Sequence, residues 1–359
     1  MVNIKTKSDY VITDNFKPGP KNGHLSVKDP NFAEVEAATV EALAPLWEAA
    51  VPLDKFKEGW VTAPPAIPDG CPEPGKDVFI SQMKVTVRDG TEIEIQIYRP
   101  PELRTDAALV FRMHGGGWTV GSHSTSLRFH GDSPVPPSQL TRSSRAPEFP
   151  YPYPIEDSWD VLKWCKVHAK YLGVNPEKII LAGNSGGGNM AACLAIKARD
   201  EGLTGIVAQS LVFPVTCHPK FFSEVPNKEK YELLSYSQNH QAAIVDSYRM
   251  EFFWDQYVGT DPKPDPGHSP LLHQLKDLKG LPPAFVHAAG LDPLRDEGIA
   301  YAEALKAAGN DVQLAAYPGL PHCFYMFVGF KQTKDYFERV IGFVKKHADA
   351  GPGQAKSHI

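Results

Sequence analysis

A serine in a glycine-rich turn is the first feature of this sequence that could do chemistry. Gly183-Asn184-Ser185-Gly186-Gly187 has the pattern G-x-S-x-G and lies between an apolar run at 179–182 and a helical pattern at 186–199. A sharp strand-to-helix turn exposes the serine Oγ, and the helix N-terminus favours negative charge beside it. The pattern alone is common by chance, but this position between strand and helix predicts Ser185 as a nucleophile.

A second glycine cluster predicts the group that would stabilise a negatively charged oxygen. His114-Gly115-Gly116-Gly117-Trp118 follows an apolar run at 107–111. Three successive glycines cost conformational entropy, which a simple turn does not explain. Backbone N–H groups of Gly116 and Gly117, joined by that of Gly186, would bind the oxyanion of a tetrahedral intermediate. We therefore predict an oxyanion hole formed by Gly115, Gly116, Gly117 and Gly186.

A serine hydroxyl needs a base to act as a nucleophile at neutral pH, and that base needs an acid to orient it. In the sheet folds that carry this turn, the acid and then the base follow the serine along the chain. Asp292 follows the apolar run 284–288 and is the predicted acid, whereas His322 follows the run 312–317 and is the predicted base. Asp296 is the competing acid, but its position one helical turn later fits a supporting carboxylate better.

The rest of the sequence supplies a sheet and helices to hold these residues. Alternating apolar and polar residues on both sides of Asp89-Gly90 predict a β-hairpin over 78–98. From residue 107 onward, buried strands alternate with helices, so the predicted fold class is α/β with a mostly parallel central sheet and helices on both faces. The predicted strands are 107–111, 179–182, 206–213, 284–288 and 312–317, and the predicted helices are 33–50, 186–199, 297–308 and 335–347.

Four motifs jointly resemble the hormone-sensitive-lipase-like carboxylesterase branch of the α/β-hydrolase superfamily, in its fungal-type form. They are His114 to Trp118, Gly183 to Gly187, Asp292-Pro293-Leu294-x-Asp296 and Pro321-His322-x-Phe324. The resemblance covers about residues 78–347, and 145–150 and 154–157 match it as well. It implies the α/β-hydrolase fold and a catalytic triad of Ser185, Asp292 and His322.

The resemblance also implies a helical cap over the pocket. The cap would combine an N-terminal segment, 1–75, with an aromatic-rich insertion, 214–283, whose aromatic residues form its core, line an apolar pocket, or both. The catalytic domain would span 76–350 and include an atypical segment, 122–145, before a flexible tail at 351–359.

The sequence departs from the family pattern in two places. Asn184 and Gly186 stand where the branch commonly has Asp and Ala, and both preserve the turn and its donor N–H. Between Ser122 and Arg145 the family has a helix and an apolar central strand, but this chain has no β-branched run and has Pro134, Pro136 and Pro137. We expect no central strand here. The leading hypothesis is a local reading-frame or splicing error, and the alternative is a true loop that leaves the sheet gapped, with two strands lacking backbone partners.

Composition excludes several other classes of function. A net charge of -5, with 22% charged residues, offers no basic surface for nucleic acid, and no apolar stretch is long enough to span a bilayer. The N-terminus lacks the apolar region of a secretory signal. The five cysteines include no C-x-x-C pair, and no Cys/His cluster has the spacing of a zinc site, so no metal or organic cofactor is expected. Free thiols predict an intracellular, cytoplasmic protein, with peroxisomal targeting through Ser357-His358-Ile359 as the alternative.

The leading functional hypothesis is a serine hydrolase that cleaves small or medium carboxylic esters through an acyl-enzyme. Amide or lactone hydrolysis and acyl transfer would use the same residues and stay open. By analogy with related fungal proteins, the substrate belongs to secondary metabolism. The alternative is a non-catalytic small-molecule binder on the same fold, which the presence of His322 disfavours. The predicted partner is the small-molecule ester itself, and a homodimer is left open.

Overall fold

The strands of the chain form one large sheet. The computed structural model describes residues 2, 4–5, 8, 19–47, 52–60, 72–102, 106–121, 137–140 and 145–349. Within this part, eight strands lie in the order β1-β2-β4-β3-β5-β6-β7-β8. The strands are β1 (Phe79–Thr86), β2 (Glu92–Arg99), β3 (Ala107–Met113), β4 (Pro137–Leu140), β5 (Val174–Asn184), β6 (Ile206–Val212), β7 (Ala284–Leu291) and β8 (Val312–Pro321).

The sheet combines an antiparallel hairpin with a parallel body, as predicted. Strands β1 and β2 pair with Thr86 opposite Glu92. The N–H of Gly90 donates to the carbonyl of Val87 at 2.9 Å, and Gly90 has a φ of 85°, which glycine adopts without strain. From β4 to β8 all neighbouring strands are parallel. Since parallel strands end at one edge of the sheet, the segments after β3, β5, β7 and β8 meet there.

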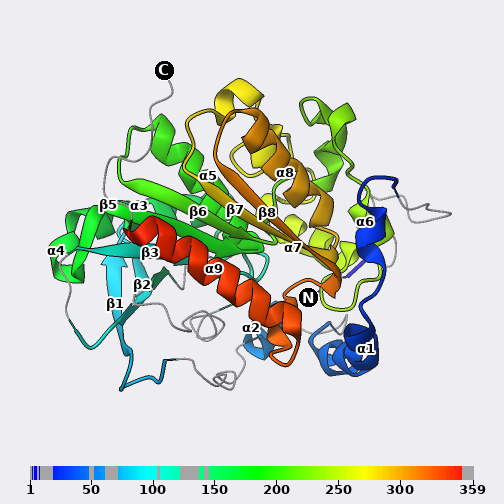
Figure 1. The fold of residues 1–359 in the computed structure, drawn as a ribbon, viewed down its shortest axis with the longest axis horizontal. Helices are drawn as coiled ribbons and strands as arrows, with labels where there is room; N and C mark the ends of the chain where they lie inside the picture. Colours follow the sequence, from blue (N-terminus) through cyan, green and yellow to red (C-terminus); the bar gives the residue numbers. More distant parts are fainter. Residues whose placement is uncertain are drawn as a thin grey trace.

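Helices cover both faces of the sheet, which confirms the predicted fold class. Leu109, Phe111 and Met113 of β3 belong to the hydrophobic core shared with α3 (Tyr153–Val167), α5 (Gly186–Asp200) and α8 (Arg295–Ala307). The alternate residues Ala108 and Val110 join the core under α9 (Lys331–Asp349) on the other face. Figure 1 shows α9 crossing in front of the strands. Because β3 is buried on both faces, its sequence is a continuous apolar run rather than an alternating one.

The expectation that no central strand forms between Ser122 and Arg145 is wrong. Residues Pro137–Leu140 form β4, which pairs antiparallel with β2 and parallel with β3 and so fills the place between them. Pro137 stands at the first position of the strand, where its missing N–H removes least from the ladder. The sheet is therefore not gapped, although β4 has only four residues. Residues 122–136 and 141–144, with Pro134 and Pro136, lie outside the described residues.

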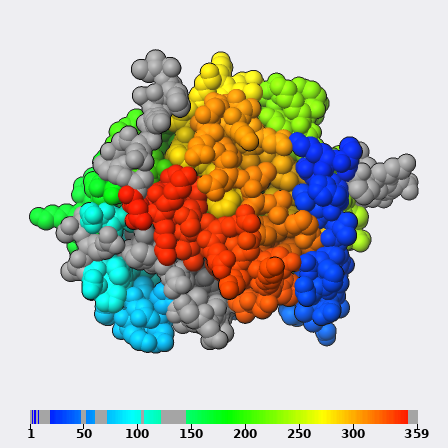
Figure 2. All heavy atoms as spheres, viewed as in Figure 1, coloured from blue at the N-terminus to red at the C-terminus, as the bar shows by residue number. Residues whose placement is uncertain are grey.

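The N-terminal segment and the insertion contribute short helices that lie against each other. They are η1 (Gly23–Ser26), α1 (Pro30–Leu43), η2 (Ala44–Trp47) and α2 (Leu53–Gly59) before the sheet, and η4 (Pro219–Glu224), η5 (Lys228–Lys230), α6 (Ser235–Gln238), α7 (Ser247–Val258), η6 (Pro270–Leu272) and η7 (Leu275–Leu278) in the insertion. Trp47 packs on Phe253 of α7, with ring centroids 5.6 Å apart, and Phe56 packs on Phe252 at 5.5 Å. In Figure 2 the N-terminal residues lie along the surface formed by the C-terminal part of the chain.

The observed helices differ from the predicted ones mainly at their ends. Helix α1 begins at Pro30 rather than 33, because the carboxylate of Asp29 accepts a hydrogen bond from the N–H of Asn31 and caps it. The predicted helix 33–50 ends as α1 at Leu43 and continues as the 3-10 turn η2, and 48–50 lie outside the described residues. Helices α3, α4 (Ala169–Leu172) and α7 were not predicted, nor was the short turn η8 (Phe324–Met326).

Candidate active site

The predicted nucleophile lies in a strained turn between β5 and α5. Ser185 has φ 57° and ψ −124°, a conformation that a residue with a side chain rarely adopts. A Cβ on Gly183 would lie 2.1 Å from the carbonyl oxygen of Gly187, and one on Gly187 would lie 2.2 Å from that of Met113. The glycines of the motif are therefore required by the close packing of the turn against α5 and against the end of β3.

The predicted acid and base are joined by a short hydrogen bond. Asp292 and His322 follow the last residues of β7 and β8, and the Nδ1–H of His322 donates to Oδ2 of Asp292 at 2.6 Å. The other carboxylate oxygen, Oδ1, accepts from the N–H of Leu294 at 2.9 Å. Both side chains are buried. Burial disfavours the charged imidazole, but the charge of Asp292 and its hydrogen bond outweigh this, so the pKa of His322 is raised well above its ordinary value.

Phe213 connects the serine turn with the histidine. The N–H of Ser185 donates to the carbonyl of Val212, the last residue of β6, at 2.9 Å. The next residue, Phe213, packs its ring 5.6 Å from the ring of His322. Among the described residues, Oγ of Ser185 makes no hydrogen bond to His322. Such bonds often form only once substrate is bound.

The predicted oxyanion loop lies directly against the serine turn. Gly116 and Gly117 have φ values of 114° and 54°, so both positions favour glycine. A Cβ on Gly186 would lie 3.1 Å from the backbone nitrogen of Trp118, which places the start of α5 beside this loop. On the other side, a Cβ on Gly117 would lie 2.1 Å from the ring of Phe253, so the insertion closes over it. None of the described residues accepts a hydrogen bond from the N–H groups of Gly116, Gly117 or Gly186.

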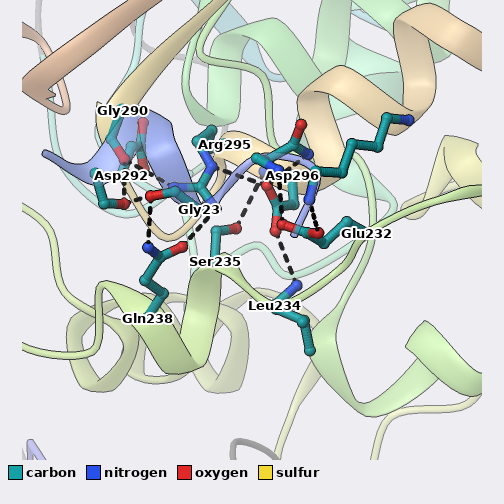
Figure 3. A network of polar contacts seen from close by, with 12 residues as sticks. Gly23, Glu232, Leu234, Ser235, Gln238, Gly290, Asp292, Arg295 and Asp296 are labelled. Carbon is teal, nitrogen blue, oxygen red and sulfur yellow. Dashed lines mark hydrogen bonds and ion pairs between the residues drawn. The ribbon is translucent and has the colours of Figure 1, made fainter. Parts of the chain in front are cut away.

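The competing acid, Asp296, accepts hydrogen bonds from other groups than His322 (Figure 3). Its Oδ1 accepts from Nε of Arg295 at 2.8 Å and from the side chain of Asn22 at 3.0 Å, and its Oδ2 accepts from the N–H of Leu234 at 2.9 Å. Arg295 and Asp296 are both buried, so this ion pair is closed to solvent. Among the described residues, Asp296 thus bonds to Arg295, to the N-terminal segment and to the insertion, and not to a histidine.

Two polar residues that the sequence did not single out, Arg112 and Tyr325, bond to Asn184 of the serine turn. Asn184 accepts a hydrogen bond from Nη2 of Arg112 at 3.2 Å and donates one from Nδ2 to the hydroxyl of Tyr325 at 3.1 Å. Tyr325 lies three residues after His322, so Asn184 links β3, the serine turn and the histidine loop. The departure of Asn184 from the family pattern was the only signal in the sequence that pointed here.

A parallel sheet whose strand ends carry a serine turn, an acid and a histidine defines the class of α/β hydrolases. Comparison with known proteins bears this out, because a family model described as the alpha/beta hydrolase fold matches residues 110–326. The chain belongs to this family. The predicted place in its hormone-sensitive-lipase-like carboxylesterase branch is confirmed by relatives named as esterases.

Three relatives illustrate the proteins to which this chain is similar. Carboxylesterase NlhH of Mycobacterium tuberculosis is 36% identical over 71% of this chain and 78% of its own length. An AB hydrolase superfamily protein of Schizosaccharomyces pombe is 32% identical over 89% of this chain and 96% of its own. Versiconal hemiacetal acetate esterase of Dothistroma septosporum is 32% identical over 73% of this chain and 80% of its own. These names confirm the predicted class, a carboxylic-ester hydrolase, and offer nothing for a non-catalytic binder.

Solved structures agree with this assignment. A mutant of the esterase rPPE in complex with (S)-Ac-CPA superposes with a TM-score of 0.77 at 28% identity, over 90% of this chain and 99% of that one. Vibralactone cyclase superposes with a TM-score of 0.73 at 27% identity, over 90% and 96%. In the described part of this chain, no helix is long and apolar enough to cross a membrane, and no cluster of His, Cys, Asp and Glu side chains could hold a metal ion.

Proposed function

We propose that the chain hydrolyses small or medium carboxylic esters through an acyl-enzyme formed on Ser185. The observation that carries this is the buried 2.6 Å hydrogen bond between His322 and Asp292 at the strand edge where the strained serine turn also lies. His322 takes the proton of Ser185 as Oγ attacks the ester carbonyl, and it returns that proton to the leaving alcohol. Water then attacks the acyl-enzyme. His322 takes a proton from this water and gives it to Oγ of Ser185 as the acid product leaves. Asp292 holds the imidazole in the tautomer that this requires.

The N–H groups of Gly116, Gly117 and Gly186 would stabilise the oxyanion of each tetrahedral intermediate. The left-handed φ values at Gly116 and Gly117, and the approach of Gly186 to the same loop, support this role. Gly115 would shape the loop, since a Cβ there would lie 2.5 Å from the side chain of Asn184. Each donor lowers the barrier by about 3 kcal/mol.

Covalent labelling tests the nucleophile. A fluorophosphonate probe should label the wild-type protein with one equivalent at Ser185, and Ser185→Ala should not be labelled. Ser158→Ala is the matched control, because Ser158 is also buried but bonds to the carbonyl of Pro154 in its own helix and to the sulfur of Met190 in α5, away from the acid and the base. A folded wild-type protein that never reacts would refute the proposal.

The proposed cap combines segment 1–75 with insertion 214–283, and its support is the aromatic packing of Trp47 and Phe56 on α7. Phe253 closes over Gly117, so a bulky acyl group would meet this ring, which favours small or medium esters. The relatives include versiconal hemiacetal acetate esterase and ethyl acetate hydrolase, whose names support acetate esters as substrates, and a setting in secondary metabolism stays a prediction by analogy. Hydrolysis rates measured on esters of graded acyl length, and on a lactone and an amide, test whether small or medium esters are the preferred substrates.

The compartment and the oligomeric state are further parts of this proposal. Four cysteines in the described residues are free, and three of them are buried, which supports a reducing, cytoplasmic location. The peroxisomal alternative rests on Ser357-His358-Ile359, which lies outside the described residues, as does the proposed tail 351–359. A fluorescent protein fused to the N-terminus, with and without the last three residues, distinguishes the two compartments. The homodimer stays a prediction that sedimentation equilibrium checks.

A further inference from the structure

Residues 22–29, here called the N-terminal strap, lie against the ends of both strands that carry the acid and the base. A Cβ on Gly290, near the end of β7, would lie 2.0 Å from the carbonyl oxygen of Leu25. A Cβ on Gly319, near the end of β8, would lie 2.3 Å from that of Val27. The N–H of Asp29 donates to the carbonyl of Gly319 at 3.0 Å. One short segment, far away in the sequence, thus makes backbone contact with both strand ends.

Side chains reinforce the contact on the acid side (Figure 3). The carbonyl of Gly290, two residues before Asp292, accepts hydrogen bonds from Nδ2 of Asn239 at 3.2 Å and from Nη1 of Arg295 at 3.1 Å. Oγ of Ser26 lies 3.0 Å from this carbonyl and 3.0 Å from Oδ1 of Asn239, so its one proton serves these two acceptors. Ser26 also accepts from Nη1 of Arg295 at 2.6 Å. The strap, the insertion and the start of α8 therefore converge on one carbonyl group.

The position of this carbonyl matters because Asp292 has little freedom relative to it. Asn239 donates to the carbonyls of both Gly290 and Asp292, and Oδ1 of Asp292 is fixed by the N–H of Leu294. The remaining oxygen, Oδ2, meets His322, whose strand end is held by the same strap through Asp29. The relative placement of the two strand ends sets the geometry of the 2.6 Å bond between acid and base.

We infer that the N-terminal strap is a positioning element for the pair Asp292 and His322. This inference rests on the proposed function, since the pair is taken as the acid and base of the hydrolase. Ser26 acts on the acid side through its hydroxyl, and the backbone N–H of Asp29 acts on the base side. Loosening either contact weakens the bond between Asp292 and His322. The loss should fall on kcat more than on KM, because the two contacts hold the strand ends that carry the acid and the base.

Two variants test the strap from its two ends. Ser26→Ala removes the hydroxyl, and Ser26→Thr restores it. Asp29→Pro removes the N–H while keeping a φ of -66°, which proline adopts without strain, and Asp29→Ala controls for the loss of the carboxylate that caps α1. Ser158→Ala controls for the loss of a serine hydroxyl elsewhere.

Kinetics on p-nitrophenyl acetate should show kcat reduced on the order of tenfold in Ser26→Ala and Asp29→Pro, since a misplacement of 1 Å costs up to about 10²-fold. Ser26→Thr should recover most of the loss, and Asp29→Ala and Ser158→Ala should stay within about twofold. The pKa of His322, followed by NMR of histidine-labelled protein, should fall in the two impaired variants, because the carboxylate that raises it is held less well.

The NMR titration distinguishes a failure of the proposed hydrolase function from a failure of the positioning role of the strap. A wild-type protein that hydrolyses no ester, with the expected fall in the His322 pKa, counts against the proposed function and supports the strap. An active wild type with unchanged kcat and unchanged His322 pKa in both Ser26→Ala and Asp29→Pro overturns the strap. If one variant does not fold, the other, on the opposite end of the strap, decides in the same way.

Discussion

Replacing Asp292 by Asn is the sharpest test of the acid, because the structure dictates how the amide must sit. The two carboxylate oxygens accept from two different donors, the N–H of Leu294 at 2.9 Å and Nδ1–H of His322 at 2.6 Å. An amide has only one oxygen, so one of these donors must face the NH₂ group. A backbone N–H cannot give up its proton, but an imidazole can move its proton to the other nitrogen. The amide oxygen should therefore stay on Leu294 and its NH₂ group should face Nδ1 of His322.

This arrangement puts the imidazole in the wrong tautomer. With Nδ1 as an acceptor, the proton sits on Nε2, which then cannot take the proton of Ser185. The same replacement in a Ser-His-Asp triad lowers kcat by about 10⁴, which corresponds to about 5.5 kcal/mol of barrier. The pKa of His322 should fall as well, because the charge that raises it is gone. The free energy of unfolding should change little, since the N–H of Leu294 and the imidazole of His322 both keep a hydrogen-bond partner in the amide.

The assay is kcat and kcat/KM on p-nitrophenyl acetate, with thermal unfolding followed by circular dichroism. Asp296→Asn is the matched control, because it removes the charge of the neighbouring acid. Asp296 accepts from Arg295, so this variant should lose stability, by about 3 kcal/mol for an uncompensated buried charge, yet keep kcat within about tenfold. A result in which Asp292→Asn stays within tenfold of the wild type, while Asp296→Asn loses activity, would refute the assignment.

Three further predictions follow from the geometry of the turn and the core. Gly187→Ala should give little folded protein, since its Cβ would lie 2.2 Å from the carbonyl of Met113. Gly186→Ala should fold with a smaller loss of stability, since its Cβ would lie 3.1 Å from the backbone nitrogen of Trp118, a tight contact that a shift of a few tenths of an ångström relieves. Soluble yield and unfolding midpoints check this, and a wild-type midpoint for Gly187→Ala would contradict it. Asn184→Asp should raise stability by about 1 kcal/mol in denaturant unfolding, because the hydrogen bond from the guanidinium of Arg112 to a neutral amide oxygen becomes an ion pair with a carboxylate, and a lower stability would count against that bond. Burial lowers the pKa of His287 to about 3, below the ordinary 6.5 of the unfolded chain, so the unfolded state binds the extra proton between these values. The free energy of unfolding should fall as the pH drops from about 6.5 toward 3, and His287→Leu should flatten that dependence in urea titrations; an unchanged slope would show that other groups cause it.

The sequence was sufficient for the fold class and for the order of the site residues, because both depend on local patterns. Buried parallel strands are continuous apolar runs, and residues that follow such runs must gather at one sheet edge. Ser185, Asp292 and His322 each follow such a run, and in the fold they directly follow the ends of β5, β7 and β8. The glycine requirement at Gly187 was also predictable in kind, although not the contact with β3 that enforces it.

Contacts between segments far apart in the chain could not be predicted from the sequence. Strand β4 has little strand propensity of its own, and its four residues form a strand because β2 and β3 offer unpaired N–H and C=O groups on both sides. The link from Asn184 to Tyr325 and the contact of Ser26 with Gly290 are long-range hydrogen bonds of ordinary polar residues. Nothing in their local sequence distinguishes them from surface positions.

The acidic run after β7 shows why structure was needed to separate similar residues. The sequence offers Asp292, Asp296 and Glu297 within six positions, and spacing alone only favours the first. In the fold, Asp296 accepts from Arg295, so its charge is compensated. Burial raises the pKa of Glu297 well above its ordinary value; hydrogen bonds from the N–H groups of Thr216 and Cys217 oppose this, and the nearby Asp292 and Asp296 reinforce it. Asp292 is then the one carboxylate of the three that faces a histidine. Because Asp296 accepts from Arg295 and Glu297 accepts from the N–H of Thr216, the partners of each carboxylate distinguish the three, and it is Asp292 that holds His322.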